Sequence, residues 1–218
     1  MESLKTPWTF VFGNHEADYH KMERLLKVIF TMNTKYMYFK VGPLLENGGY
    51  GNFTINYLYE DNPFYNLYLL DSKAELKIPG SGRLFVYDYF SEAQVDWYRN
   101  KVVIDKINNI KSTVFAHIPL IQYADALLIE NKDKVKGIIG ERISHQEVDT
   151  GFFNAMVEST VSEAFFAGHD HLNNFTFEKD GIILGYGQIS GYNGYGTLRR
   201  GARIIEIDES KMFKTYVV

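Results

Sequence analysis

Two histidines separated by one aspartate stand where an apolar segment gives way to polar sequence. Residues 161–167 are typical of a buried strand, and Gly168 interrupts them just before His169, Asp170 and His171. Imidazole nitrogens bind borderline cations such as zinc at about 2.0–2.1 Å. On an extended strand the two rings would share a face, and on a turn after Gly168 they could reach adjacent metal ions. The pattern therefore raises the question of a metal site at a strand end.

Two other predicted strands end in residues of the same kinds. Residues 9–12 lead to Asn14 and His15, and residues 113–116 lead to His117. In open α/β sheets, ligand sites gather at the carboxyl ends of strands, and a strand end is rigid enough for metal coordination. An amide oxygen can supply a further, harder ligand. We therefore expect five side chains to lie close together: Asn14, His15, His117, His169 and His171.

Each of these residues also has a purely structural interpretation. A lone histidine at a strand end is usually hydrogen-bonded and structural, and this is the favoured interpretation of His117 taken by itself. Gly13-Asn14 is an ordinary turn sequence. His20 lies on a predicted helix and His145 in a polar loop, and neither is assigned a role. The occurrence of three such strand ends in one chain favours a shared site.

The elements that must position these residues follow from periodicity and turn residues. Apolar residues at helical spacing predict helices over residues 18–31 and after Ser91, where Gln94 completes a capping box. A shorter helix is predicted over residues 151–158. Aromatic and β-branched runs predict further strands at residues 36–41, 53–59, 65–70, 174–178, 182–186, 203–207 and 212–217.

Turn residues separate these elements and indicate the fold class. Asp180-Gly181 is a strong hairpin signal, whereas residues 79–82 and 130–150 are predicted loops. Strands alternate with helices in the first part of the chain, and an antiparallel meander is predicted at its end. This order indicates a layered α/β domain with a mixed sheet or two packed sheets.

Composition limits the possible functions of the chain. Its 218 residues suit one domain, 1–218, and a net charge of −4 with a pI of about 5.9 gives no signal for nucleic-acid binding. The absence of cysteine excludes disulfides, thiolate zinc sites and a cysteine nucleophile. No apolar run approaches the roughly 18 residues of a membrane span, and the N-terminus lacks a signal-peptide core. We expect a soluble chain whose compartment the sequence does not indicate.

The motifs GNHE (13–16), AHIP (116–119) and GHDH (168–171), in that order, resemble the calcineurin-like metallophosphoesterases. The stretches PWTFVFGNHE, YNLYLLDS, FAHIPLIQYADAL and TGFFNAMVEST are similar to the purple-acid-phosphatase-like branch, and together the matches span nearly the whole chain. The resemblance implies two mixed β-sheets packed as a sandwich flanked by helices, in four layers α/β/β/α. It also implies a dinuclear metal centre of iron, zinc or manganese ions.

The resemblance assigns a role to each candidate residue. Asn14, His117 and His169 would bind one metal ion and His171 the other. His15 would lie over the substrate phosphate, as a catalytic residue that stabilises the transition state or protonates the leaving group. Asp170 would support the ligands or the backbone. The implied reaction is hydrolysis of a phosphoric ester, by a phosphatase or phosphodiesterase, through a metal-activated hydroxide.

The chain departs from the family pattern before Gly13. Complete members carry Asp-x-His and Gly-Asp-x-x-Asp/Asn motifs there, which supply most ligands of the first metal, and neither Asp nor His occurs in residues 1–12. We therefore expect the first βαβ portion to be missing, as in a fragment, a truncated gene model or a degenerate relative. Weak or partial metal occupancy and self-association through an exposed sheet edge are expected consequences.

Three hypotheses follow for the function of the chain. The first is a phosphoric ester hydrolase that is impaired or inactive in this form, acting on a phosphorylated substrate of unknown class. The second is a non-catalytic binding module that retains the fold, and the third is a site for a single structural zinc ion. Residues 185–196, rich in glycine and tyrosine, are either a substrate-facing wall or a flexible turn.

Overall fold

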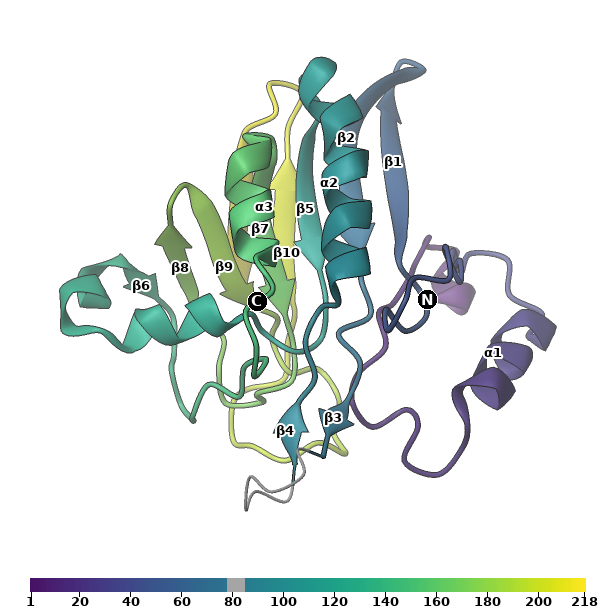
Figure 1. Cartoon of the computed structure of the whole chain (residues 1–218), viewed down its shortest axis with the longest axis horizontal. Helices are drawn as coiled ribbons and strands as arrows, with labels where there is room; N and C mark the ends of the chain where they lie inside the picture. The colour runs from purple at the N-terminus through teal and green to yellow at the C-terminus, as the bar shows by residue number, and fades with distance from the viewer. Residues whose placement is uncertain (78–84) are drawn as a thin grey trace.

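A seven-stranded mixed β-sheet forms the centre of the molecule. The structure is a computed structural model that describes residues 1–77 and 85–218 (Figure 1). The strands lie in the order β1 (Phe53–Tyr59), β2 (Asn62–Leu69), β5 (Lys111–Phe115), β7 (Ser162–Ala167), β9 (Ile182–Tyr186), β8 (Thr176–Lys179) and β6 (Val135–Lys136). Strands β2, β5, β7 and β9 are parallel, and β1 and β8 are antiparallel to their neighbours. The prediction of an α/β protein with a mixed sheet is therefore confirmed.

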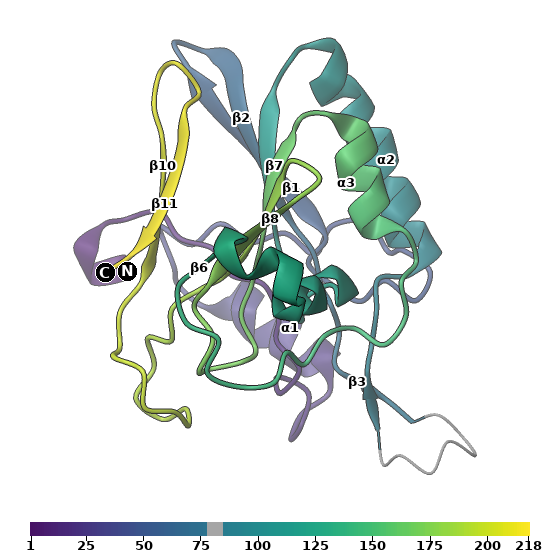
Figure 2. The same cartoon turned by 90° about the vertical axis from the view of Figure 1, so that its left-hand side faces the viewer.

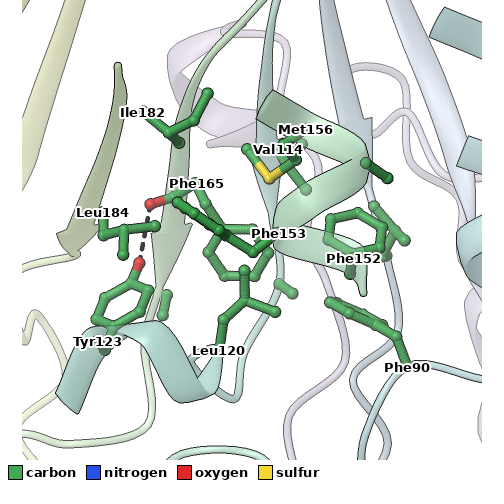
Figure 3. Packing of buried hydrophobic residues seen from close by; sticks show 14 of the residues in the cluster. Phe90, Val114, Leu120, Tyr123, Phe152, Phe153, Met156, Phe165, Ile182 and Leu184 are labelled. Atoms are coloured by element: carbon green, nitrogen blue, oxygen red, sulfur yellow. Dashed lines mark hydrogen bonds between the residues drawn. The ribbon is translucent and has the colours of Figure 1, made fainter. Parts of the chain in front are cut away.

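Two helices, α2 (Glu92–Ile107) and α3 (Phe152–Ser159), cover one face of this sheet (Figure 2). The predicted capping box at the start of α2 is confirmed, because the Ser91 hydroxyl and the Gln94 side chain each accept from the other residue's backbone amide. Phe152 and Met156 of α3 are fully buried and pack toward Phe165 of β7 (Figure 3). The Tyr123 hydroxyl donates to the Phe165 carbonyl at 2.8 Å. This packing makes β5 and β7 a rigid support for the loops that follow them.

A two-stranded hairpin lies against the opposite face of the sheet. It consists of β10 (Arg203–Ile207) and β11 (Phe213–Val217) and stands as a separate layer in Figure 2. The Phe166 ring stacks between Phe115 and Phe213, with centroid distances of 5.7 and 6.3 Å. The described residues thus form three layers, namely helices, central sheet and hairpin. A second small sheet joins β3 (Glu75–Leu76) to β4 (Val86–Tyr87).

The predicted meander of the last strands is only partly right. The Asp180-Gly181 turn does join β8 to β9, with φ values of 50° and 79° that suit a tight hairpin. However, β9 also pairs in parallel with β7, and β10 pairs only with β11 in the described part of the chain. The prediction failed here because strand order in a sheet depends on contacts distant in sequence.

The N-terminal segment contains less regular structure than expected. It begins with the 3₁₀ helix η1 (Glu2–Leu4), and α1 (Met22–Thr31) starts four residues later than predicted and stands to one side of the sheet (Figure 1). The predicted strands at residues 9–12 and 36–41 are wrong. In the described part of the chain, one isolated parallel bridge joins Trp8, just before the first of these segments, to Met37 in the second. Stacked rings, Phe10 on Phe39 at 4.8 Å, hold these extended segments together instead of a ladder.

The remaining expectations concern loops and membrane spans. Residues 130–150 are largely irregular, as predicted, apart from β6 and the 3₁₀ helix η3 (Ile129–Lys134), which follows η2 (Ile121–Leu127). The predicted loop at residues 79–82 lies outside the described residues. Within residues 1–77 and 85–218, no helix combines the length and the apolar character needed to cross a membrane.

Candidate metal and phosphate site

The predicted site residues gather beside the ends of β5 and β7. These two strands are adjacent and parallel, so the loops that follow them leave the sheet at the same edge. The Gly168 amide donates to the His117 carbonyl at 3.0 Å, which fixes one loop against the other. A cavity of about 440 Å³ lies here, and its lining includes all five residues expected to converge: Asn14, His15, His117, His169 and His171. A larger cavity of about 620 Å³ lies elsewhere, beside Lys73 and Asp88, and contains none of them.

Three of the predicted metal ligands bring their donor atoms together. The Oδ1 atom of Asn14 lies 3.0 Å from Nε2 of His117, and Nδ1 of His169 lies 3.3 Å from the same nitrogen. Positions 14 and 117 are 103 residues apart in the chain. These atoms either share the proton on His117 or present three lone pairs to one cation. Their role as ligands stays a prediction, but their convergence is a property of the fold.

Burial keeps the two clustered imidazoles neutral. Desolvation, followed by the neighbouring rings of His169, His15 and His171, lowers the pKa of His117 to about 3. Desolvation is also the largest influence on His169 and lowers its pKa, although the carboxylate of Asp170 opposes the shift. A neutral imidazole retains the lone pair that a metal ion or a proton requires. The electrostatics of the cluster are therefore compatible with ligation.

The backbone around the cluster is tightly constrained. A side chain at Gly13 would place its Cβ 3.1 Å from Cε1 of His117, so any larger residue there would crowd that imidazole. His169 adopts a φ of 75°, which is uncommon for a residue with a side chain. Such conformations cost of the order of 1–3 kcal/mol and concentrate at functional sites. The sequence Gly-His-Asp-His thus supplies both the turn and the groups it presents.

His15 lies at the exposed rim of the cavity. Its side chain is 75% exposed, and its Nδ1 lies 2.9 Å from a carboxylate oxygen of Asp18. The amide nitrogen of Asn14 lies 3.3 Å from Nε2 of His15. Because an amide NH₂ only donates, Nε2 accepts from Asn14 and Nδ1 donates to Asp18. Sequence analysis missed Asp18, although its spacing of three residues from His15 was a usable signal.

Asp170 supports the backbone rather than contributing to the cluster of donor atoms. It is buried, and its Oδ2 accepts from the Ser144 amide at 3.0 Å and from the Tyr186 hydroxyl at 2.6 Å. These bonds fasten the loop before α3 and the end of β9 to the turn that carries His169 and His171. That Asp170 also supports the ligands stays a prediction.

His171 lines the same cavity and belongs to a separate group of contacts. Its ring stacks on Tyr195 with centroids 4.2 Å apart, and its Nδ1 lies 3.3 Å from the Tyr195 carbonyl oxygen. Desolvation and a hydrogen bond to Glu141 raise the pKa of Tyr195 to about 12. His171 therefore lines the cavity without joining the three clustered donor atoms.

Two further cavity-lining residues came from strands too short to predict. Glu75 of β3 lies 3.5 Å from the Asn14 amide nitrogen, and the Tyr87 ring of β4 packs edge-on against His169 at 4.5 Å. Neither strand exceeds two residues, so periodicity gave no signal for them. Together they add one carboxylate and one aromatic wall to the site.

The chemistry of the donor set determines how well a metal ion fits. Two neutral imidazole nitrogens and an amide oxygen suit one borderline cation such as zinc. No negatively charged ligand belongs to this trio, and within the described ranges no three His, Cys, Asp or Glu side chains form a metal-binding group. The trio therefore fits one weakly held ion, and these side chains alone do not supply the dinuclear centre that the resemblance implied.

Comparison with known proteins relates the chain to phosphatases. No family model matches it. Probable inactive purple acid phosphatase 14 of Arabidopsis thaliana is 28% identical over 232 residues, covering 96% of this chain and 55% of that protein. Phosphatase DCR2 of Saccharomyces cerevisiae is 29% identical over 191 residues, covering 81% of this chain and 32% of that protein.

The chain is a distant homologue of the purple acid phosphatases. It spans about half the length of the purple acid phosphatase relatives that it matches. A crystal structure of a dimetal phosphatase from Danio rerio covers 63% of this chain and 49% of its own, with 13% identity and a TM-score of 0.42. That score is too low to establish a shared fold.

The homology to purple acid phosphatases covers all parts of the site. The match to the Arabidopsis relative extends over 96% of the chain, so it includes the N-terminal loop and both strand-end loops. The three motifs that resemble the metallophosphoesterases therefore lie within the region that aligns with the relative. The names of the relatives differ on activity, because one is called a phosphatase and another a probable inactive one.

Proposed function

We propose that this purple acid phosphatase homologue provides a metal-dependent site for phosphoric ester hydrolysis, as a phosphatase or phosphodiesterase. The observation that supports this proposal is the meeting of Asn14, His117 and His169 donor atoms within 3.0 and 3.3 Å at the ends of adjacent strands. These three residues would hold one ion of zinc, iron or manganese. When bound, such an ion would polarise a phosphoryl oxygen and lower the pKa of water.

In this proposal His15 acts as the proton donor to the leaving group. Neutral His15 accepts from Asn14 at Nε2 and donates to Asp18 at Nδ1. Protonation would place a hydrogen on Nε2, which would break the contact with the Asn14 amide and turn that nitrogen toward an acceptor. Asp18 would stabilise the resulting imidazolium. Loss of such a general acid lowers rates by about 10²–10⁴-fold.

The finer features of the resemblance belong to the same proposal. A second metal ion would use His171, with further ligands beyond the clustered trio. Residues 1–218 would form one domain of the four-layer α/β/β/α type. The β10–β11 hairpin lies on the face where the second sheet of such a sandwich would pack. The substrate would be a phosphorylated molecule whose class the site leaves open.

The test is metal binding measured separately from turnover. Isothermal titration with zinc or manganese should show weak binding to the wild-type chain and none to His117→Ala. His20→Ala is the matched control, because His20 is exposed and outside the cavity lining. With added metal, we expect hydrolysis of p-nitrophenyl phosphate by this chain alone to be close to background. Zinc binding that survives His117→Ala would contradict the proposed site.

A non-catalytic binding module is the second candidate function. It is favoured by the neutral donor trio and by the lack, among the described side chains, of a group of three His, Cys, Asp or Glu residues. In that case inorganic phosphate or phenyl phosphate should bind in the presence of zinc without being turned over. Robust hydrolysis that is lost in His117→Ala would rule this candidate out in favour of the enzyme.

A further inference from the structure

The segment between β9 and β10 encloses His171. Its residue Tyr195 stacks on the imidazole with an interplanar angle of 23°. Nδ1 of His171 lies 3.3 Å from the carbonyl oxygen of the same tyrosine. Because a carbonyl oxygen only accepts, Nδ1 carries the proton and Nε2 keeps a free lone pair. One residue therefore sets both the plane and the tautomer of His171.

Two glycines beside Tyr195 allow this close approach. A Cβ atom at Gly194 would lie 3.0 Å from Cε1 and 3.1 Å from Nδ1 of His171, inside ordinary contact distance. Gly196 has a φ of 106°, which residues with side chains rarely adopt. The glycine before Tyr195 thus leaves room for the His171 ring, and the glycine after it allows the backbone turn. This favours a structured wall over a flexible turn for this part of residues 185–196.

Glu141 ties the same tyrosine to the turn that carries His171. One carboxylate oxygen accepts from the Tyr195 hydroxyl at 2.9 Å, and the other accepts from the Leu172 amide at 2.6 Å. The carboxylate thereby links the stacking ring to the residue that directly follows His171. Charge-assisted hydrogen bonds of this kind are about twice as strong as neutral ones.

Arg200 holds the enclosing segment in its curved form. Its guanidinium donates to the carbonyl oxygens of Gly194 at 2.9 Å, Leu198 at 3.0 Å and Gly196 at 3.3 Å. Three bonds to one short stretch of backbone fix the positions of its peptide units. The side chain of Tyr195 is consequently presented to His171 by an ordered loop.

We propose that Tyr195 and Glu141 are positioning residues for His171. Tyr195 fixes the orientation and tautomer of the imidazole, and Glu141 fixes Tyr195 relative to the His171 turn. The result is an imidazole whose Nε2 lone pair is available to a cation or a proton. A metal-binding role for His171 rests on the proposed function. The fixed tautomer of His171 is independent of that proposal.

The tautomer is measured directly by long-range proton–nitrogen NMR of the histidine side chains. In the wild-type chain, His171 should show a protonated Nδ1 and an unprotonated Nε2. Tyr195→Leu should shift it toward a mixture of tautomers, because the ring stack and the hydroxyl bond to Glu141 are lost and only the bonds from Arg200 still position the carbonyl of residue 195. Tyr195→Phe should keep the stack but lose the bond to Glu141, and Glu141→Gln should give the same intermediate result.

Tyr192→Leu is the matched control, since Tyr192 lies in the same loop and is 88% exposed. It should leave the His171 spectrum unchanged. A protonated Nε2 on His171 in the wild type would overturn the proposal, and so would identical spectra in wild type and Tyr195→Leu. A Tyr195→Leu chain that does not fold is recognised by its amide spectrum, and Tyr195→Phe then decides.

Zinc titration followed at the same nitrogens separates this inference from the proposed function. Disturbing a residue that orients a metal-binding histidine typically weakens affinity 10–100-fold, and we expect this loss at His171 in Tyr195→Leu. Equal zinc affinity at His171 in both chains would contradict a positioning role toward metal. If the wild type binds no zinc, the proposed function fails, while the tautomer measurement still decides the positioning of His171.

Discussion

The central sheet and the N-terminal segment are built in different ways, although both contribute to the site. Strands β2, β5 and β7 run through a core whose residues, such as Val114 and Phe165, are fully buried. In contrast, none of the ten described residues of α1 is buried, and residues 9–12 make no strand ladder in the described part of the chain. His117 and His169 come from the first region, and Asn14 comes from the second. The donor trio therefore depends on how firmly the N-terminal segment docks.

A small polar cluster makes the junction between the two regions. The fully buried Asn52 side chain donates to the Gly48 carbonyl at 2.7 Å and accepts from Gln94 of α2 at 2.9 Å. Asp71, two residues after the end of β2, accepts from the Tyr50 amide at 2.8 Å. Buried polar networks fix one arrangement because an unsatisfied member is costly. These specific bonds thus add to one aromatic contact across the junction, that of Phe39 with Phe53 of β1, whose ring centroids lie 5.6 Å apart.

The largest effect is expected when phenylalanine is replaced by alanine once in the central sheet and once in the N-terminal segment. Phe165→Ala should lower the free energy of unfolding by about 3–5 kcal/mol, because it leaves a cavity between the sheet and α3. Phe30→Ala in α1, where the ring is 59% exposed, should cost less than about 1 kcal/mol. Urea denaturation followed by circular dichroism measures both. Equal losses would show that the N-terminal segment is packed as tightly as the sheet.

The junction itself should respond to pH through Asp71. Burial raises the pKa of this carboxyl group to about 6, against the hydrogen bonds that it accepts. The folded state then binds more protons than the unfolded state between pH 4 and 6, so stability falls as pH rises through this window. Two pKa units correspond to about 2–3 kcal/mol.

Comparison with Asp71→Asn isolates this effect. The low pKa of His117 makes stability rise with pH over the same range, but that contribution is common to both chains. The difference in unfolding free energy between wild type and Asp71→Asn should therefore change by about 2–3 kcal/mol from pH 4 to pH 6.5. A difference that is independent of pH would mean that Asp71 ionises normally in the folded chain.

The sequence was informative about the core region and about the motifs, and much less about the junctions. Residues 53–59 and 203–207 were placed correctly because their β-branched and aromatic residues are local signals. The convergence of His117 and His169 could be inferred because the ends of parallel strands meet at one edge of a sheet. Asn14 also reaches the site, but from an extended segment rather than from the strand predicted before it. Tyr195 and Glu141 could not be inferred, because their contacts depend on the path of long loops that leave no periodic pattern.

Glu2 offers a smaller and more local test of the N-terminal segment. Its carboxylate accepts from the backbone amides of Lys35 and Tyr36 at 2.8 and 2.9 Å and from the Trp8 indole at 2.9 Å. Glu2→Ala should remove hydrogen-exchange protection at those two amides, and Glu2→Gln should retain part of it. Amides of β5 and β7 should be unaffected in both variants. Loss of hydrogen-exchange protection throughout the central sheet would show that the sheet and the N-terminal segment unfold together rather than separately.

The smallest expected effect concerns the free edge of the sheet at β1. This strand pairs only with β2 among the described strands, and Tyr57, Leu58 and Tyr59 are 53, 58 and 44% exposed. An unpaired edge with apolar side chains can pair with another copy, and charged residues oppose such pairing. We expect weak, concentration-dependent self-association in sedimentation velocity that Leu58→Lys reduces. Val103→Lys, at an equally exposed position on α2, should leave it unchanged, because a helix offers no free backbone groups for pairing. If both lysine variants reduced association equally, general charge repulsion rather than the β1 edge would account for it.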